Sequence, residues 1–331
     1  MFKKIFSTLF VFFIGISCAF AQESKGKLEV VTTLFPTYDF AKQIGKDKIN
    51  VFLLLPPGVE SHTFEPKPQD VVRINKAGVF IYTGKYMEPW AEDLLKGVSN
   101  NDLVVVDSSL GIELMAEDDH DEEGEHHEGE RHDDGDDHEK EHGEEHEHGH
   151  HHHGGEDPHI WVDLAHDQVM VDTIAKALTE KDPANGAFYL NNAKEYKMKL
   201  ADLDRRFEET LSTAKHKTII YGGHFAFGYF AKRYGLEHDS PYDGFSPNAE
   251  PSPKAIASLI NKLKQSGIKY IYYEELLDPK VARTISQETG AKLELLHGAH
   301  NVSKDELARG VTFLDIMEDN LKKLKVGLEC R

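Results

Sequence analysis

Histidine is the residue type in this sequence that is best suited to bind a metal ion. Twelve of its 20 histidines crowd into one acidic segment, and eight lie elsewhere. Neutral imidazole suits Zn²⁺, and three imidazoles completed by water or one more group form a familiar zinc arrangement. The candidates for one ordered metal site are therefore the eight outside that segment: His62, His159, His166, His216, His224, His238, His297 and His300.

Three of these eight, His62, His159 and His224, lie among glycine and proline. Those neighbours fix unusual backbone paths and leave room beside an imidazole. His62 and His224 also lie at or near the carboxyl ends of predicted strands, where open α/β sheets place their ligands. A single histidine in such a place is most often a hydrogen-bonded loop residue. Three of them, together with a histidine-rich segment, favour a metal site.

The elements that must position these histidines alternate between strands and helices. Short runs rich in Val, Ile and Leu predict buried strands at 28–33, 51–55, 79–83 and 103–107, and helical spacing of apolar residues separates several of them. Three more strands are predicted at 218–221, 270–273 and 293–296. This alternation predicts an α/β fold with parallel sheets flanked by helices.

Four helical patterns bear on the architecture. Residues 169–178 predict one helix, and apolar residues three or four apart from about 185 to 214 predict another, ~45 Å long, which could join two lobes. Ser252-Pro253 predicts a helix start and Gly267 its end. A capping box at Ser303-x-x-Glu306 predicts one last helix that runs through Leu324.

The net charge of −20 belongs almost entirely to one segment. Residues 117–157 hold 20 Asp and Glu against two basic residues, so the rest of the chain is nearly neutral. Such a segment buries too little apolar surface to offset the entropy of ordering it, and we expect a disordered loop. We expect this loop to bind several Zn²⁺ ions weakly, as an auxiliary to the ordered site, through His120, His126, His127, His132, His138, His142, His146, His148, His150, His151, His152 and His153.

The first 21 residues are typical of a signal peptide. Lys3-Lys4 precedes an apolar stretch at 5–16, and Ala19-Phe20-Ala21 forms a small-x-small cleavage site. Lipid attachment at Cys18 is the alternative, disfavoured because no Leu lies three positions upstream. Later segments are too short for membrane helices, and no basic patch favours nucleic acid. We therefore expect an exported, soluble and monomeric protein.

Several motifs, taken in chain order, resemble the metal-binding solute-binding proteins of ABC transporters, and specifically their zinc-uptake branch. The likeness covers nearly all of the mature chain. Its motifs are Pro57-Gly58-x-x-x-His62 with Glu65-Pro66-Lys67-Pro68, Met87-Glu88-Pro89-Trp90, the acidic loop, Asp157-Pro158-His159-Ile160-Trp161-Val162-Asp163, Gly223-His224-x-x-Phe227-x-Tyr229 and Ala249-Glu250-Pro251-Ser252-Pro253.

The resemblance implies two four-stranded α/β lobes with metal in the cleft between them. The N-terminal lobe would span 27–183, a single long connecting helix 184–214, and the C-terminal lobe 215–331. A single helix between the lobes would permit only small tilts.

The resemblance also implies ligands. His62, His159 and His224 match the three histidine ligands of the family. The manganese branch has Glu where His224 stands, so an imidazole there favours Zn²⁺ over Mn²⁺. The family commonly has an Asp as fourth ligand just after the last strand of the second lobe. His297 is the expected substitute in this chain, with His300, Glu60 and water as alternatives.

These expectations together predict high-affinity zinc capture in the periplasm and delivery to the membrane permease of an ABC importer, without catalysis. A manganese-binding protein of the same family is one alternative. A zinc hydrolase would need a general acid or base beside the metal, and no His-Glu-x-x-His pattern supplies one. A surface adhesin or a zinc buffer that works through the acidic loop alone is another alternative, which deletion of the loop would distinguish.

Overall fold

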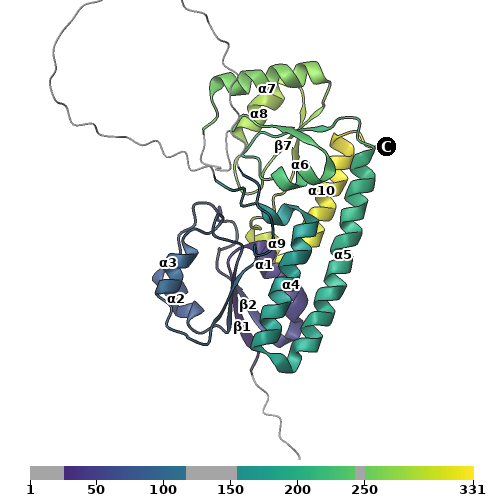
Figure 1. The fold of residues 1–331 in the computed structure, drawn as a ribbon. Helices are drawn as coiled ribbons and strands as arrows, with labels where there is room; N and C mark the ends of the chain where they lie inside the picture. The colour runs from purple at the N-terminus through teal and green to yellow at the C-terminus, as the bar shows by residue number, and fades with distance from the viewer. Residues whose placement is uncertain (1–25, 117–154, 243–249) are drawn as a thin grey trace, which may run out of the picture.

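The first half of the chain forms one four-stranded parallel sheet. The computed structural model describes residues 26–116, 155–242 and 250–331 (Figure 1). The strands are β1 (Leu28–Thr32), β2 (Ile49–Leu53), β3 (Val79–Tyr82) and β4 (Val104–Asp107), in the order β2-β1-β3-β4. All four lie within two residues of their predicted bounds. The strand order reverses between β1 and β3, which is where open α/β sheets place ligands.

Helices cover both faces of this sheet because neighbouring residues of a strand point to opposite sides. Val30 packs into the large core with α1 (Phe35–Gly45), while Val31 packs into a smaller cluster with α2 (Pro68–Ile74) and α3 (Ala91–Lys96). Short 3-10 turns lie at Lys46–Lys48, Ile160–Val162 and Pro183–Asn185.

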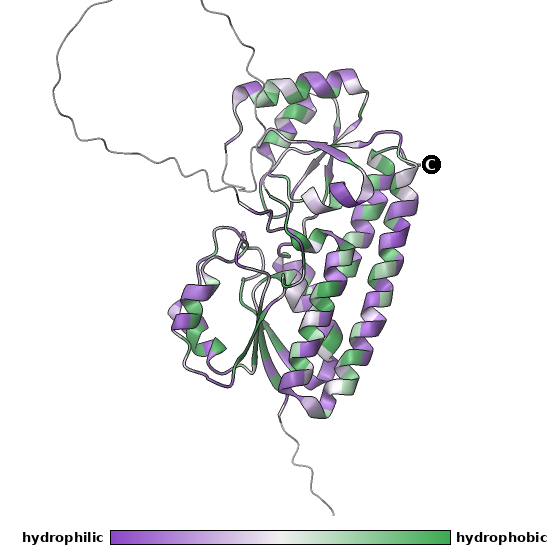
Figure 2. Ribbon diagram, in the orientation of Figure 1, coloured by the Kyte–Doolittle hydropathy of each residue, from purple (hydrophilic) through white to green (hydrophobic). Residues whose placement is uncertain are grey.

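Two long antiparallel helices follow. Helix α4 (Leu164–Lys181) extends beyond the predicted 169–178 at both ends. It starts early because Asp163 caps its first turn by accepting from the Ala165 N–H. Helix α5 (Gly186–Ser212) has 27 residues, or ~40 Å, and confirms the predicted long helix. It runs alongside both halves of the molecule, with alternating polar and apolar stripes (Figures 1 and 2).

The second half repeats the parallel arrangement. Its strands are β5 (Thr218–Ile220), β6 (Glu237–Asp239), β7 (Tyr270–Tyr273) and β8 (Lys292–Leu295), and they form the pairs β5-β6 and β7-β8. A parallel bridge between Tyr221 and Tyr272 joins the two pairs. The sequence did not predict β6, because Glu-His-Asp is a short polar run with no strand pattern. Helices α6 (Gly228–Tyr234), α7 (Pro253–Ser266) and α8 (Lys280–Thr289) connect the strands.

The chain ends in two helices, where the sequence predicted one. The capping box at Ser303 and Glu306 is present, but α9 (Lys304–Arg309) stops at Gly310, whose φ of 74° is left-handed. A second capping box at Thr312 and Asp315 then starts α10 (Phe313–Gly327). The prediction of a single helix through Leu324 was therefore wrong, because the apolar spacing continues across a glycine that ends the first helix.

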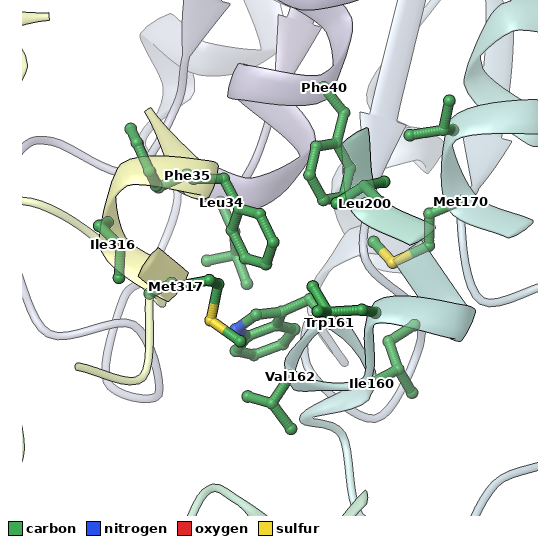
Figure 3. Packing of buried hydrophobic residues seen from close by; sticks show 14 of the residues in the cluster. Leu34, Phe35, Phe40, Ile160, Trp161, Val162, Met170, Leu200, Ile316 and Met317 are labelled. Carbon is green, nitrogen blue, oxygen red and sulfur yellow. The ribbon is translucent and has the colours of Figure 1, made fainter. Parts of the chain in front are cut away.

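The two halves share one large hydrophobic core. Phe40 of α1 packs edge-on against Phe313 of α10, with ring centroids 5.1 Å apart. Figure 3 shows Trp161 at the centre of this packing, surrounded by residues that include Phe35 and Met317. Among the helices of the described residues, none has the length and apolarity that crossing a membrane requires.

Candidate metal centre

Four histidines from distant parts of the chain converge on one point. His62 comes from the loop after β2, His159 from the turn before α4, His224 from the loop after β5, and His300 from the loop after β8. Each offers a ring nitrogen, and these four atoms lie within 4.8 Å of one another. The group therefore combines two histidines from each half of the chain.

The four rings occupy the corners of a nearly regular tetrahedron. All six distances between their centroids fall between 5.1 and 5.6 Å. The Nε2 atoms of His62 and His159 are 3.3 Å apart. In a tetrahedral zinc site with Zn–N bonds of ~2.0–2.1 Å, neighbouring nitrogens are separated by about 3.3 Å. The four rings therefore have a tetrahedral arrangement, and the His62–His159 pair has the nitrogen separation of a zinc site.

His159 is held in the tautomer that a metal needs. Its Nδ1 lies 2.7 Å from Oδ1 of Asp157, which also accepts the His159 backbone N–H at 2.9 Å. Because a carboxylate only accepts, Nδ1 carries the proton and Nε2 presents its lone pair. His159 has no exposed surface. This carboxylate–histidine pair is the arrangement that orients zinc ligands and raises their basicity.

His300 is held in the same way by a different carboxylate. Its Nδ1 lies 3.1 Å from Oε1 of Glu275, so its Nε2 is also the unprotonated atom. That Nε2 is buried and has no hydrogen-bond partner among the described residues. A buried nitrogen lone pair without a donor costs free energy unless a cation or proton meets it, which fits a metal ligand.

His224 meets a third carboxylate, and only 2% of its surface is exposed. Its Nδ1 lies 2.6 Å from Oε2 of Glu274, although the approach direction departs from hydrogen-bond geometry. Its Nε2, like that of His300, has no hydrogen-bond partner among the described residues. Three of the four imidazoles therefore have a carboxylate of their own at Nδ1.

His62 is placed by its loop instead of by a carboxylate at its ring. The carboxylate of Glu60 accepts the backbone N–H groups of His62 and Thr63 at 2.8 and 2.9 Å. Across the interface, the Asn301 amide donates to the carbonyls of Pro56 and Val59 at 2.7 and 2.9 Å. The second half of the chain thus fixes the loop that carries a ligand of the first half.

Burial keeps two of the imidazoles neutral. It is the main cause that lowers the pKa of His62 to about 2, with His300 and His224 adding to it, and it lowers the pKa of His159 well below its ordinary value. Burial also acts to lower the pKa of His300, but the hydrogen bond and charge of Glu275 outweigh it and raise that pKa. His62 and His159 are therefore ready to ligate at neutral pH, while a proton competes with metal at His300.

The structure brings the three predicted ligands together and adds His300, not His297. The His297 Nδ1 accepts the Ala299 N–H at 3.0 Å, so the proton of a neutral His297 lies on Nε2 and neither nitrogen offers a lone pair to a metal. His297, the expected fourth ligand, accordingly lies outside the tetrahedral group, whose fourth member is His300. Glu60 is also outside the group, because its carboxylate is engaged by the loop backbone.

Other sequence expectations have different outcomes. The twelve histidines of the acidic loop, from His120 to His153, lie outside the described residues. The partners Asp157, Glu274 and Glu275 were not anticipated as functional. Glu274 and Glu275 directly follow β7, so the same strand-end argument that selected His224 could have found them.

A small cavity opens beside the histidine group at the junction of the halves. Its lining includes Val59 and Glu60 from the first half and Glu274, Leu276 and His300 from the second. Acidic residues, Glu60 and Glu274 among them, therefore line the cavity beside the histidine group.

Comparison with known proteins identifies the family. Residues 30–327 match the family model of the zinc-uptake complex component A, periplasmic. This chain belongs to that family. Members of the zinc-uptake family are solute-binding transport proteins and not enzymes.

Two relatives illustrate how far the likeness extends. The high-affinity zinc uptake system protein ZnuA of Bacillus subtilis is 41% identical over 338 residues, which cover 99% of both chains. The zinc-binding protein AdcA of Streptococcus pyogenes is 36% identical over 92% of this chain. Only 56% of AdcA is covered, so this chain spans about half the length of that relative.

Several solved structures share the fold. The metal-dependent lipoprotein YcdH of Bacillus subtilis superposes with a TM-score of 0.72 at 38% identity, covering 91% of this chain and all of that one. The Zn(II)-bound ZnuA-like domain of Streptococcus pneumoniae AdcA gives 0.71 at 31% identity, covering 92% and 100%. The laminin-binding protein Lmb of Streptococcus agalactiae gives 0.74 at 26% identity, covering 91% and 99%.

Proposed function

We propose that this protein captures Zn²⁺ outside the cytoplasm with high affinity and delivers it to the permease of an ABC importer. The observation that carries the proposal is the tetrahedron of His62, His159, His224 and His300. Four neutral imidazoles match the coordination number and ligand type of Zn²⁺. A site whose four positions are all filled by protein has no open position for a substrate, which suits a carrier better than a hydrolase.

The proposal assigns each histidine the role of a zinc ligand through Nε2. The carboxylates of Asp157, Glu274 and Glu275 orient three of them. Together with Zn²⁺ these three groups leave a local charge near −1, so the bound ion is compensated within the protein. His62 is the least buried of the four.

Competition between metals tests the choice of ion. We predict that Zn²⁺ displaces Mn²⁺ by several orders of magnitude in affinity, because imidazole nitrogen and the Irving–Williams order both favour zinc. The measurement is a titration of the metal-free full chain with each ion, with a competing chelator that leaves only the tight site loaded. Comparable affinities for Zn²⁺ and Mn²⁺ would instead support the alternative of a manganese-binding protein.

We further propose that the first 21 residues direct export to the periplasm. A lipid at Cys18 gains support from relatives, since YcdH and the AdcA of Streptococcus pneumoniae are named lipoproteins. Mass spectrometry of the mature N-terminus separates the two outcomes. A start at Gln22 supports cleavage after Ala21, and a diacylglyceryl group on residue 18 supports the anchor.

Adhesion is a second candidate function, favoured by one structural neighbour. Lmb of Streptococcus agalactiae is described as a bifunctional protein with adhesin and metal transporting activity. We propose that any laminin binding by this chain is separate from zinc capture. Binding of the purified chain to immobilised laminin, with and without Zn²⁺, tests it, and no binding in either state removes the candidate.

A further inference from the structure

We propose that Glu275 is the residue that positions His300 as the fourth ligand, and that Gly298 is required for that position. The inference rests on the zinc site proposed above. It concerns the turn His297-Gly298-Ala299-His300, which carries two buried histidines of which only one faces the metal group.

The Glu275 carboxylate lies inside this turn and is buried, with 6% of its side chain exposed. Its Oε2 accepts the Gly298 N–H at 2.7 Å. Its Oε1 accepts both the backbone N–H and the Nδ1–H of His300, at 3.2 and 3.1 Å. One carboxylate therefore fixes the backbone of the turn, the direction of the imidazole and the nitrogen that carries its proton.

Gly298 fixes the other side of the ring. A Cβ at this position would lie 2.6 Å from Cε1 and 2.7 Å from Nδ1 of His300, far inside contact distance. The imidazole of His300 thus packs closely against the α-carbon of Gly298, leaving no room for a side chain there. Ala299 adopts a left-handed φ of 58°, which reverses the chain and returns His300 toward the metal group.

The turn itself is anchored to the first half of the molecule. The indole N–H of Trp161 donates to the Gly298 carbonyl at 2.7 Å, and the Phe35 N–H donates to the His300 carbonyl at 3.3 Å. Because the backbone on both sides of Ala299 is held in this way, the remaining freedom of His300 is rotation of its side chain. Glu275 removes that freedom by holding Nδ1.

A double-mutant cycle on the full chain tests the assignment. Zn²⁺ affinity is measured by chelator competition for wild type, Glu275→Ala, His300→Ala and the double variant. We expect Glu275→Ala to weaken binding about 10–100-fold, the usual loss when the partner of a metal-bound histidine is removed. In the His300→Ala background the same change should alter the affinity less than about threefold, because the residue to be positioned is gone.

Two further variants separate positioning from other effects. Gly298→Ala retains every carboxylate but displaces the His300 ring, and it should weaken Zn²⁺ binding as Glu275→Ala does. Glu288→Ala removes an exposed carboxylate of the same half and should leave affinity unchanged. The visible spectrum of the Co²⁺-loaded protein supplies a readout of coordination. Glu275→Ala and Gly298→Ala should both shift it from the wild-type spectrum toward that of His300→Ala.

The outcomes distinguish this inference from the proposed function. If Glu275→Ala weakens binding equally with and without His300, the carboxylate acts through its charge or through stability, and the positioning role is overturned. If His300→Ala weakens binding while Glu275→Ala and Gly298→Ala do not, the inference fails and the zinc site stands. If the wild type binds no Zn²⁺ tightly, the proposed function itself fails.

Discussion

At the scale of single residues, His297 and His300 are both buried and three positions apart, yet only His300 offers a lone pair. We predict that His300→Ala weakens Zn²⁺ binding about 100-fold or more, since loss of an outer partner alone costs 10–100-fold. His297→Asn should change affinity less than about threefold, because the amide oxygen can replace Nδ1 as acceptor of the Ala299 N–H. Calorimetry with chelator competition measures both, and equal losses would contradict the tautomer assignment.

The same residues show where prediction from sequence stops. Strand-end position and flanking glycine and proline selected His62, His159 and His224, because those signals are local. The choice between His297 and His300 depends on which ring nitrogen holds the proton. On His300, Glu275 determines which nitrogen holds the proton, and it lies more than 20 residues away in sequence. The left-handed conformation of Ala299 also contributes, and no local sequence pattern predicts it.

At the scale of elements, Glu88 ties the carboxyl ends of two central strands together. Its carboxylate accepts the Thr33 hydroxyl after β1 and the N–H groups of Thr83 and Gly84 after β3, at 2.5 to 3.2 Å. Burial raises the pKa of Glu88 to about 7, despite these hydrogen bonds. A buried acid with a raised pKa favours the native state while protonated and loses that contribution as the pH rises.

We therefore predict a pH-dependent part of the stability that belongs to Glu88. Its contribution is full below the unfolded pKa of about 4.5 and is lost as pH rises through about 7, a change on the order of 3 kcal/mol. Urea unfolding of the metal-free protein between pH 4.5 and 8 measures it. Glu88→Gln cannot titrate, so its unfolding free energy should lack this decline. Parallel curves for the two proteins would show that Glu88 is not the titrating group.

Element boundaries were predictable where the capping chemistry is local. Ser252 does accept the Ala255 N–H at the start of α7, and Gly267 does end that helix with a left-handed φ. The break between α9 and α10 carried equally local signals in Gly310 and the Thr312-x-x-Asp315 capping box. The break was not predicted because the apolar spacing through Val311 and Leu314 continues the helical pattern across Gly310.

At the scale of the whole molecule, the halves are joined by more than one helix. Besides α5, helix α10 returns from the second half to pack on α1 through Phe313 and Phe40, and Asn301 and Val302 bond to the loop that carries His62. Histidines from both halves are therefore held by a continuous core. Such packing is consistent with capture by a largely preformed site, in which little chain must be ordered on binding.

The last prediction concerns the acidic loop and follows from how its ends are held. Ala116 and Glu156 form an antiparallel bridge, and the Asp157 N–H donates to the Met115 carbonyl at 2.8 Å. The chain thus leaves and returns at one place, with paired α-carbons about 5 Å apart, so residues 117–155 can be replaced by a two-residue Asn-Gly turn. Each of the four histidines and its contacting carboxylates lies outside the deleted segment.

We expect the shortened protein to retain the tight Zn²⁺ site within about threefold in affinity while losing the additional weak sites. From its composition we expect the loop to concentrate and chelate the cation with an affinity below that of the four-histidine group, because ordering so polar a segment costs entropy at each binding event. Loop binding should also vanish below about pH 6, where histidines with ordinary pKa values protonate. Zinc stoichiometry of the two proteins at pH 7.5 and 5.5 is the measurement. Equal stoichiometry at pH 7.5 would reject binding by the loop, and loss of the tight site on deletion would show that the four-histidine group depends on the loop after all.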